Sequence, residues 1–402
     1  MVVLNNCNNH SYIYLCRKYA GICVVILAHL MSSSRTAQAQ VVRGAVELPS
    51  GAKAMAPHMT AGPDGTVYLS WVERGEGMAS LHMARRDGAA WVDVEQIASG
   101  SDWFVNWADV PTITVGADGA MLATWLQRLG EGRYAYGVRQ AVRQADGAWT
   151  APEWLHEDVS ETEHGFVSAE WTGTDFLVTW LDGAGYGAGR GEMEVHARTV
   201  SPAGATGPEH VLDSRACDCC PTAMTRTADG RVVSAWRDRS EGEIRDIVVA
   251  TRSADGSWSE PKVQHDDGWL IQACPVNGPA LDAFGNDIGL VWFTAAGDAP
   301  AVWARINDGP PVRVDAGRPS GRVAARMLSP TELAVVWLED GLWMRIIGTG
   351  GPSGGSASEP VRLADASSAR STGYPVMERL GDDRLLVVWT GNGLSAVEVD
   401  VP

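Results

Sequence analysis

The stretch Ala228-Asp-Gly-Arg-Val-Val-Ser-Ala-Trp236 contains the pattern that decides the fold. An Asp-Gly turn is followed by a run of mostly apolar residues, and the run ends in tryptophan. The same pattern, with small variations in the turn, occurs seven times at intervals of 54, 55, 56, 56, 45 and 52 residues. Such a steady period predicts a repeat architecture. The seven copies end at Trp71, Trp125, Trp180, Trp236, Trp292, Trp337 and Trp389.

Each copy contains further short runs with the composition of β-strands. A run such as residues 247–252 follows the tryptophan, and three copies then show an Asp-Gly turn with a second tryptophan, at Trp91, Trp149 and Trp258. About four strands per ~50 residues is typical of a propeller blade. Two or three β-sandwich domains in series are the alternative, but the repeat runs on without a linker. We therefore expect an all-β, seven-bladed β-propeller of four-stranded antiparallel blades.

The two ends of the repeat complement each other. The last copy has no outermost strand, whereas residues 41–48 precede the first copy and have the composition of one. Pairing the two would close the ring and cover an exposed strand edge. We expect one propeller domain over residues 40–402. Its blades span about 52–100, 101–157, 158–213, 214–267, 268–317, 318–368, and 369–402 plus 41–51.

Residues 1–39 differ from the repeat and resemble a secretory signal. Arg17 and Lys18 precede an apolar run over residues 20–31, and a small-residue cleavage pattern ends at Ala39. The apolar run is shorter than a membrane-spanning helix, and no other segment approaches ~18 consecutive apolar residues, so we expect no transmembrane segment in the mature chain. The sequence thus predicts a periplasmic or secreted protein.

Charge excludes one class of partner. The chain carries 49 acidic and 32 basic residues, a formal net charge of −17. Removal of the predicted signal takes away three basic residues and no acidic one, which gives −20. Nucleic-acid binding needs clustered Lys and Arg, and none are clustered here. We therefore expect a small-molecule or glycan ligand, or a protein partner, and no nucleic acid.

Four cysteines follow the predicted cleavage site: Cys217, Cys219, Cys220 and Cys274. They lie in the loops that lead into blades four and five, which are neighbours, so they should meet at one mouth of the central channel. Two disulfides, one joining the blades, are one interpretation. A strained bridge between Cys219 and Cys220 is another. Copper or zinc, with Met224 adding a thioether, and a redox dithiol remain as alternatives.

The loops that lead into the blades carry polar and aromatic residues that should converge on the channel axis. Together they predict a funnel for a small polar or glycan-type ligand. The predicted ligand-binding residues are His58, Trp107, Asp109, His164, Trp269, Asn277 and Arg318, with Trp103 and Glu161 nearby.

The turns at residues 144–149 and 253–258, together with the cysteine segments, resemble the bacterial sialidase-like, Asp-box-related propellers, in particular a secreted, cysteine-rich subgroup. The resemblance implies an arginine group for a substrate carboxylate, a tyrosine nucleophile and a helping glutamate. Tyr374, Arg322, Arg237 and Glu163 are the positions that match these roles. Residues 56–59 lack the arginine that the family enzymes carry there, and those enzymes have six blades. We therefore expect a sialidase-like binding protein, with an exo-α-sialidase-type hydrolase and a soft-metal or redox protein as alternatives.

Overall fold

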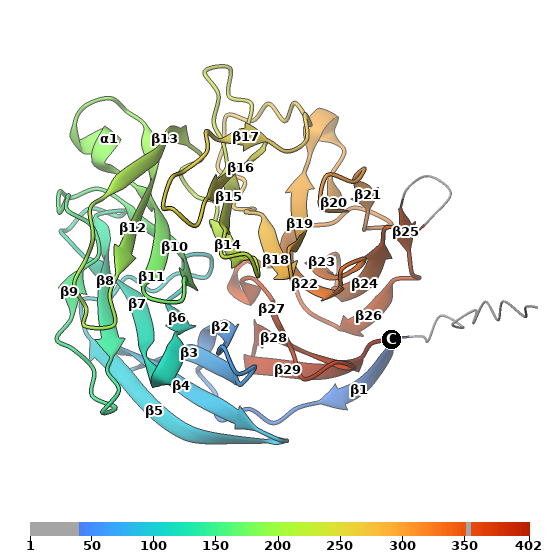
Figure 1. Ribbon diagram of the computed structural model, residues 1–402, viewed down its shortest axis with the longest axis horizontal. Coiled ribbons are helices and arrows are strands. Elements are labelled where there is room, and N and C mark those ends of the chain that lie inside the picture. The colour runs from blue at the N-terminus through green and yellow to red at the C-terminus, as the bar shows by residue number, and fades with distance from the viewer. Residues whose placement is uncertain (1–39, 351–354) are drawn as a thin grey trace, which may run out of the picture. The chain divides into compact units, whose positions relative to one another are not determined.

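The computed structural model describes residues 40–350 and 355–402, so the predicted signal lies outside the described residues. Seven antiparallel sheets follow one another around a ring (Figure 1), which confirms the predicted seven-bladed propeller. Within the described residues, helix is confined to the single turn α1 (Ala184–Gly187) and the 3-10 turns η1 (Ala117–Gly119), η2 (Ala296–Asp298) and η3 (Arg370–Thr372). None of these is long and apolar enough to cross a membrane.

The first four blades each contain four strands in sequence order, with the innermost strand first. Blade one comprises β2 (Met55–Ala61), β3 (Val67–Gly75), β4 (Met78–Asp87) and β5 (Ala90–Gly100). Blade two comprises β6 (Thr112–Val115), β7 (Met121–Arg128), β8 (Tyr136–Arg143) and β9 (Glu153–Trp154). Blade three comprises β10 (His164–Trp171), β11 (Phe176–Asp182), β12 (Met193–Val200) and β13 (His210–Ala216). Blade four comprises β14 (Ala223–Arg226), β15 (Val232–Arg237), β16 (Ile247–Arg252) and β17 (Lys262–Val263).

Blade five follows the same plan, whereas blades six and seven vary it at their outer edge. Blade five comprises β18 (Ala280–Phe284), β19 (Asp287–Thr294), β20 (Ala301–Ile306) and β21 (Val312–Arg313). Blade six comprises β22 (Gly321–Ser329), β23 (Glu332–Leu338), β24 (Leu342–Gly348), β25 (Ser356–Ala357) and β26 (Val361–Ala364), and both β25 and β26 pair with β24. Blade seven comprises β27 (Val376–Arg379), β28 (Arg384–Gly391), β29 (Gly393–Asp400) and β1 (Val41–Ala45).

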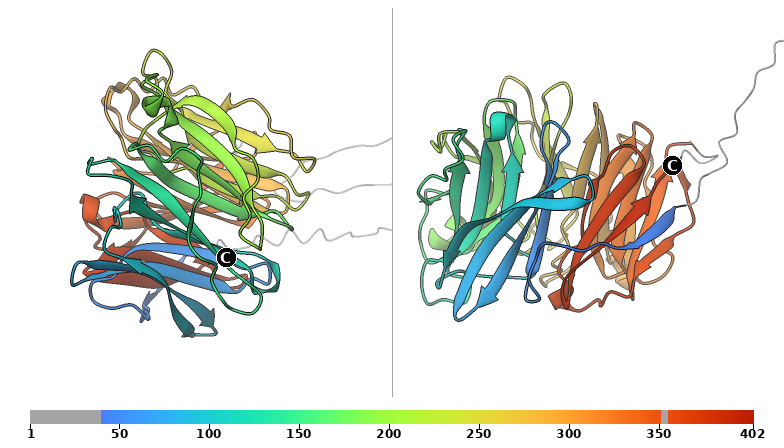
Figure 2. Two further views of the ribbon diagram at one scale, coloured as in Figure 1. Left: turned by 90° about the vertical axis from the view of Figure 1, so that its left-hand side faces the viewer. Right: turned by 90° about the horizontal axis from the view of Figure 1, so that it is seen from below.

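The predicted closure of the ring is confirmed. β1 pairs antiparallel with β29, with Val41 opposite Asp400 and Ala45 opposite Val397. Figure 2 shows β1 lying alongside the C-terminal strands. The strand from the beginning of the described chain thus covers the edge that β29 would otherwise expose.

The seven repeat tryptophans hold neighbouring blades together. All seven are at most 9% exposed, and each lies in a different hydrophobic cluster. Trp71 of blade one, for example, packs with Leu386 and Val388 of blade seven. Several indole N–H groups also donate to a carboxylate, as Trp180 does to Asp182 at 2.6 Å. A buried indole fills the wedge between blades and finds a partner for its one polar group.

Candidate functional site

One face of the ring carries the connecting loops, each of which leads from one blade into the innermost strand of the next; we call it the mouth face. Loops distant in sequence meet there. Trp107, Cys217, Val276 and Tyr374 belong to one apolar cluster although they come from blades two, four, five and seven. Most of the predicted ligand-binding side chains in these loops are buried, so the loops pack against one another more closely than an open funnel would.

Irregular backbone marks the ends of the inner strands at this face. Phe166 on β10 and Arg322 on β22 have φ values of 55° and 53°, and the pairing register shifts beside both. A residue other than glycine is strained at such φ values, and the surroundings must hold it there. Asp109 and Asn277 do so, because an Oδ1 atom of each accepts the strained residue's backbone N–H at 2.7 Å. Two predicted ligand residues therefore have internal partners.

Asp109 also takes part in a chain of three acidic groups. The Tyr136 oxygen lies 2.5 Å from Glu163 Oε1 and 3.1 Å from Asp109 Oδ2. The tyrosine hydroxyl can donate its one proton to only one of the two carboxylates. Both hydrogen bonds form when the other carboxyl group is protonated and donates to the tyrosine oxygen.

The pKa values of the two carboxyl groups agree with this sharing. Burial, together with the charge of Glu163, raises the pKa of Asp109 to about 8. Burial also raises the pKa of Glu163 to about 7, and the charge of Asp218 adds to the effect. Tyr136 and Asp109 are at most 1% exposed, whereas Glu163 is only partly buried. Glu163 is therefore the member of the chain that can reach a ligand.

Tyr374, the residue matched to the sialidase nucleophile, has a different environment. Its hydroxyl donates to the Val276 carbonyl at 2.7 Å and accepts the Gly278 N–H at 3.3 Å. Burial raises its pKa far above the usual value. Glu163, the helping glutamate expected beside Tyr374, contacts Tyr136 instead.

Arg237 and Arg322 lie near Tyr374 but are held by the protein. Three backbone carbonyls accept hydrogen bonds from Arg237, those of Asn277, Arg245 and Phe293, at 2.6 to 2.9 Å. Arg322 donates to the carbonyls of Ala369 and Ser368 and lies 4.7 Å from the Trp107 ring centre. Both guanidinium groups therefore stabilise the loops of the mouth face through hydrogen bonds to backbone carbonyls.

His164 is fully buried in a hydrogen-bonded row. Its Nδ1 lies 3.1 Å from Asp182 Oδ2, its Nε2 lies 3.1 Å from Thr162 Oγ1, and its ring stacks on His156 at 4.1 Å. Asp158 lies on the Nε2 side of the ring, opposite Asp182. Because the two acids face different ring nitrogens, the group fits a hydrogen-bond relay better than a metal chelate.

The other predicted ligand residues are spread over the face and the channel. His58 on β2 is half-buried, and its pKa is lowered to about 4 by desolvation and by the charge of Arg326. Trp269 packs beneath Arg237 and against Phe293. Trp103 stacks on Trp125 at 5.6 Å. Arg318 is exposed and has no hydrogen-bond or ion-pair partner among the described residues.

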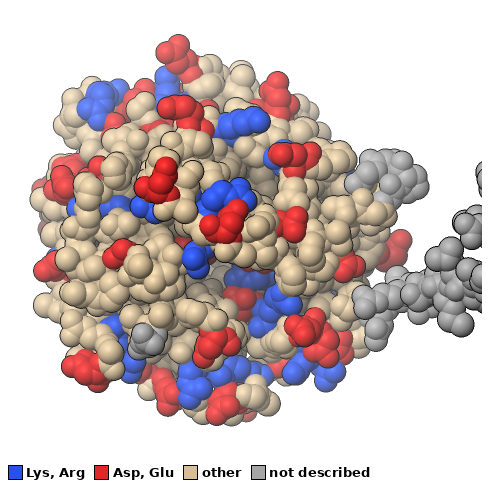
Figure 3. All heavy atoms as spheres, viewed as in Figure 1, with Lys and Arg blue, Asp and Glu red and all other residues tan. Residues whose placement is uncertain are grey.

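The central channel contains charged side chains from the inner strands. Arg326 on β22 bonds Glu378 on β27 through Nε at 2.9 Å and lies 3.6 Å from Asp282 on β18. Burial raises the pKa of Glu170 on β10 to about 8. Figure 3 shows basic and acidic side chains together in the hollow at the centre of the ring. The repeat pattern did not mark these residues, because their partners lie on other blades.

The four cysteines meet at the mouth face as the sequence predicts. Cys219 and Cys274 form a disulfide between the connecting loops of blades four and five. Cys217 and Cys220 are buried free thiols with their sulfur atoms 3.3 Å apart. Met224 packs with Leu177 and Val232 in another cluster, and the thioether expected from it stays a prediction.

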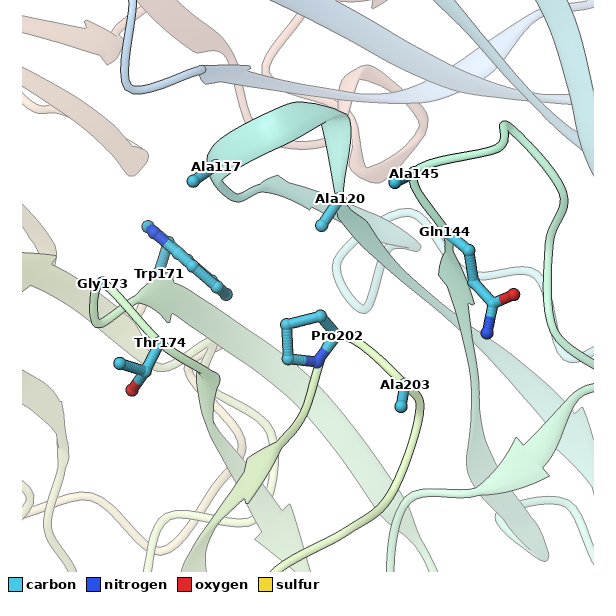
Figure 4. A pocket seen from close by; sticks show the side chains of 9 residues that line it. All are labelled: Ala117, Ala120, Gln144, Ala145, Trp171, Gly173, Thr174, Pro202 and Ala203. Carbon is cyan, nitrogen blue, oxygen red and sulfur yellow. The ribbon is translucent and has the colours of Figure 1, made fainter.

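A cavity of about 510 Å³ lies away from this chemistry, on the opposite face between blades two and three (Figure 4). The Trp171 ring and Pro202 border it, with Gln144 at one side. A ligand pocket needs a few convergent polar groups as well as volume. Its lining residues include no titratable side chain, and Thr174 supplies the one hydroxyl, so we place the candidate site at the mouth face.

Comparisons with known proteins reveal likeness in fold. No family profile matches the sequence, and no curated protein matches it significantly. Among solved structures 245 chains match. One is an ulvan lyase bound to a glucuronic acid–rhamnose 3-sulfate unit, at 11% identity and a TM-score of 0.52 over 88% of this chain and 93% of the lyase. A second polysaccharide lyase matches at 10% identity and 0.51 over 89% and 92%.

A sialidase of Trypanosoma rangeli matches at 14% identity with a TM-score of 0.45, over 90% of this chain and 60% of the sialidase. At these identities the likeness defines the fold alone. The chain is a seven-bladed β-propeller, and the two polysaccharide lyases resemble it in fold. The expected seven-bladed propeller is thus confirmed, and the sialidase-like, Asp-box-related family stays a prediction.

Proposed function

We propose that the protein binds an anionic glycan at the mouth face and cleaves it, with Glu163 as the group that transfers the proton. The chain Glu163–Tyr136–Asp109 carries this proposal. A carboxyl group with a pKa of about 7 exchanges its proton readily at neutral pH, as a general acid or base must. Glu163 is the only one of the three that reaches the surface.

Tyr136 and Asp109 act as positioning residues in this account. The tyrosine hydroxyl fixes one Glu163 oxygen, and Asp109 fixes the tyrosine. Both are buried, so neither touches the glycan. Their burial keeps water away from one side of Glu163 and maintains its raised pKa.

Two exposed arginine side chains indicate that the ligand carries negative charge. Arg318 and Arg370 are exposed in the connecting loops of blades six and seven and have no acidic partner among the described residues. Carboxylate or sulfate groups of a glycan would supply one. The ulvan lyase with a similar fold binds a chain of this kind, which supports the same substrate class here. The secretion predicted from residues 1–39 would bring the protein to such polymers.

A sialidase mechanism built on Tyr374 is less favoured, because its hydroxyl and the Arg237 guanidinium are already bonded to backbone groups. Glycan binding without cleavage remains the second candidate. It is favoured by the dense internal bonding of the mouth face.

The proposal is tested with ulvan as the acidic probe and arabinan as the neutral one. We expect new sugar ends only from ulvan, and binding that weakens as salt is added. Replacing both Arg318 and Arg370 with alanine should weaken binding about tenfold, whereas Arg74→Ala, an exposed arginine in another blade, should leave it unchanged. Binding of ulvan without new ends would support the second candidate. Binding and cleavage of arabinan to the same extent as ulvan would contradict the proposed ligand class.

A further inference from the structure

Two of the four cysteines, Cys217 and Cys220, are free thiols buried in the apolar cluster of the mouth face. Cys217 and Cys220 are 0% and 1% exposed, and their sulfur atoms are 3.3 Å apart. Nothing in the proposed glycan chemistry uses them. We propose that this pair binds one copper(I) ion as a two-coordinate dithiolate.

The surroundings suit sulfur atoms that carry negative charge. Arg245 Nη1 donates to Cys217 Sγ at 3.2 Å, and the Asn277 backbone N–H donates to Cys220 Sγ at 3.4 Å. Two thiolates and one monovalent ion have a net charge of −1. Arg245, which also pairs with Glu243 through Nη2 at 2.9 Å, and the buried Arg237 supply positive charge beside the two sulfur atoms, where an unpaired ion would be costly.

The number of available ligands separates copper(I) from zinc. Structural zinc takes four ligands in a tetrahedron. Only two thiolates are available here, because Cys219 is bonded to Cys274 and Met224 lies in another cluster. The nearby Asp218 is already engaged, since Tyr186 donates to its Oδ1 at 2.8 Å. Soft thiolate ligands favour copper(I), and this ion accepts two of them.

The site needs only a small change to hold the ion. A metal–sulfur bond of ~2.3 Å would place the two sulfur atoms roughly 4.5 Å apart in a linear complex. The separation must therefore widen by about 1 Å, which side-chain rotation can supply. The backbone need not move: the Cys217 N–H is bonded to the Arg237 carbonyl at 3.0 Å, and the disulfide of Cys219 fixes the same loop.

The experiment uses the chain from residue 40, purified without oxygen and titrated with copper(I) against bicinchoninate as competing chelator. We expect one copper(I) per chain and an X-ray absorption spectrum with two sulfur neighbours. Cys217→Ser and Cys220→Ser should each lower the affinity at least a hundredfold. The double variant Cys219→Ser, Cys274→Ser removes the disulfide and keeps the pair, so it should still bind one ion. Zinc, titrated in the same way, should not bind stoichiometrically.

Three results would overturn the proposal. One is copper uptake that persists when Cys217 and Cys220 are both replaced. Another is wild-type protein with two titratable thiols that takes up no copper. The third is a Cys217–Cys220 disulfide found by peptide mapping of the anaerobic protein. The absorption spectrum of the wild type decides the case even if a serine variant fails to fold.

Discussion

The Tyr136 oxygen lies 2.5 Å from Glu163 Oε1 and so takes the glutamate that the sequence resemblance assigned to Tyr374. Tyr374 instead donates to the Val276 carbonyl at 2.7 Å. The exchange of partners moves the proposed acid–base group from blade seven to blades two and three. It also leaves a glutamate, not a tyrosine, as the group nearest to solvent.

The raised carboxyl pKa values predict how stability depends on pH. The pKa of Asp109 is raised from 3.8 to about 8, so between these values the folded protein holds a proton that the unfolded chain releases. Stability from this group is therefore full below about pH 4 and is lost as pH rises through about 8. Asp109→Asn should flatten the fall in unfolding free energy between pH 5 and 9 by at least ~1.4 kcal/mol, the equivalent of one pKa unit.

This prediction is checked by melting wild-type and variant protein at pH 5, 7 and 9. The asparagine keeps an oxygen that can accept the Phe166 N–H, so the bulge should survive. Melting temperatures that run parallel across the pH range would show that Asp109 is ionised in the folded protein.

The bond from Asn277 to the strained Arg322 backbone predicts a specific loss of stability. Asn277→Ala leaves the buried Arg322 N–H without its acceptor, which should cost about 1–3 kcal/mol. Asn286→Ala is the matched control, because this exposed asparagine accepts a single backbone bond, from Asp229 at 2.9 Å. Urea unfolding of both variants provides the measurement. Equal losses would mean that the Arg322 bulge needs no acceptor.

Ring closure predicts the effect of a short deletion. A chain that begins at residue 46 lacks β1 and exposes the edge of β29. We expect it to melt earlier than a chain that begins at residue 40 and to self-associate through the open edge. Light scattering and thermal melting compare the two. A monomer with an unchanged melting temperature would show that β1 adds nothing to the closure.

Much of the fold follows from the sequence because each repeat carries its own signals. The tryptophan that ends each repeat, the Asp-Gly turns and the missing last strand are local patterns, and together they specify seven blades and their closure. Gly65, Gly119 and Gly230 of these turns have φ values near 80°, which glycine adopts without the steric cost of a side chain. Local pattern and global fold agree at these positions.

The site was harder to predict because its partners come from different blades. Tyr136 is part of an ordinary strand pattern, and only the ring places it between Asp109 and Glu163. The three carbonyls that occupy Arg237 belong to the backbone and leave no mark in the sequence. The cysteines could be predicted in part. The sequence placed all four in neighbouring loops, so it predicted that they lie close together, but it did not specify the Cys219–Cys274 disulfide.

The rate at which ulvan gains new sugar ends, compared between Glu163→Gln and Glu161→Gln, tests the proposed function most directly. The two glutamates lie in the same loop, but Glu161 is exposed and has no bond to Tyr136. We predict that Glu163→Gln lowers the rate at least a hundredfold while binding is kept, the scale expected for loss of a general acid or base. Glu161→Gln should stay within about twofold of wild type. A Glu163→Gln variant that cleaves as fast as wild type would contradict the account.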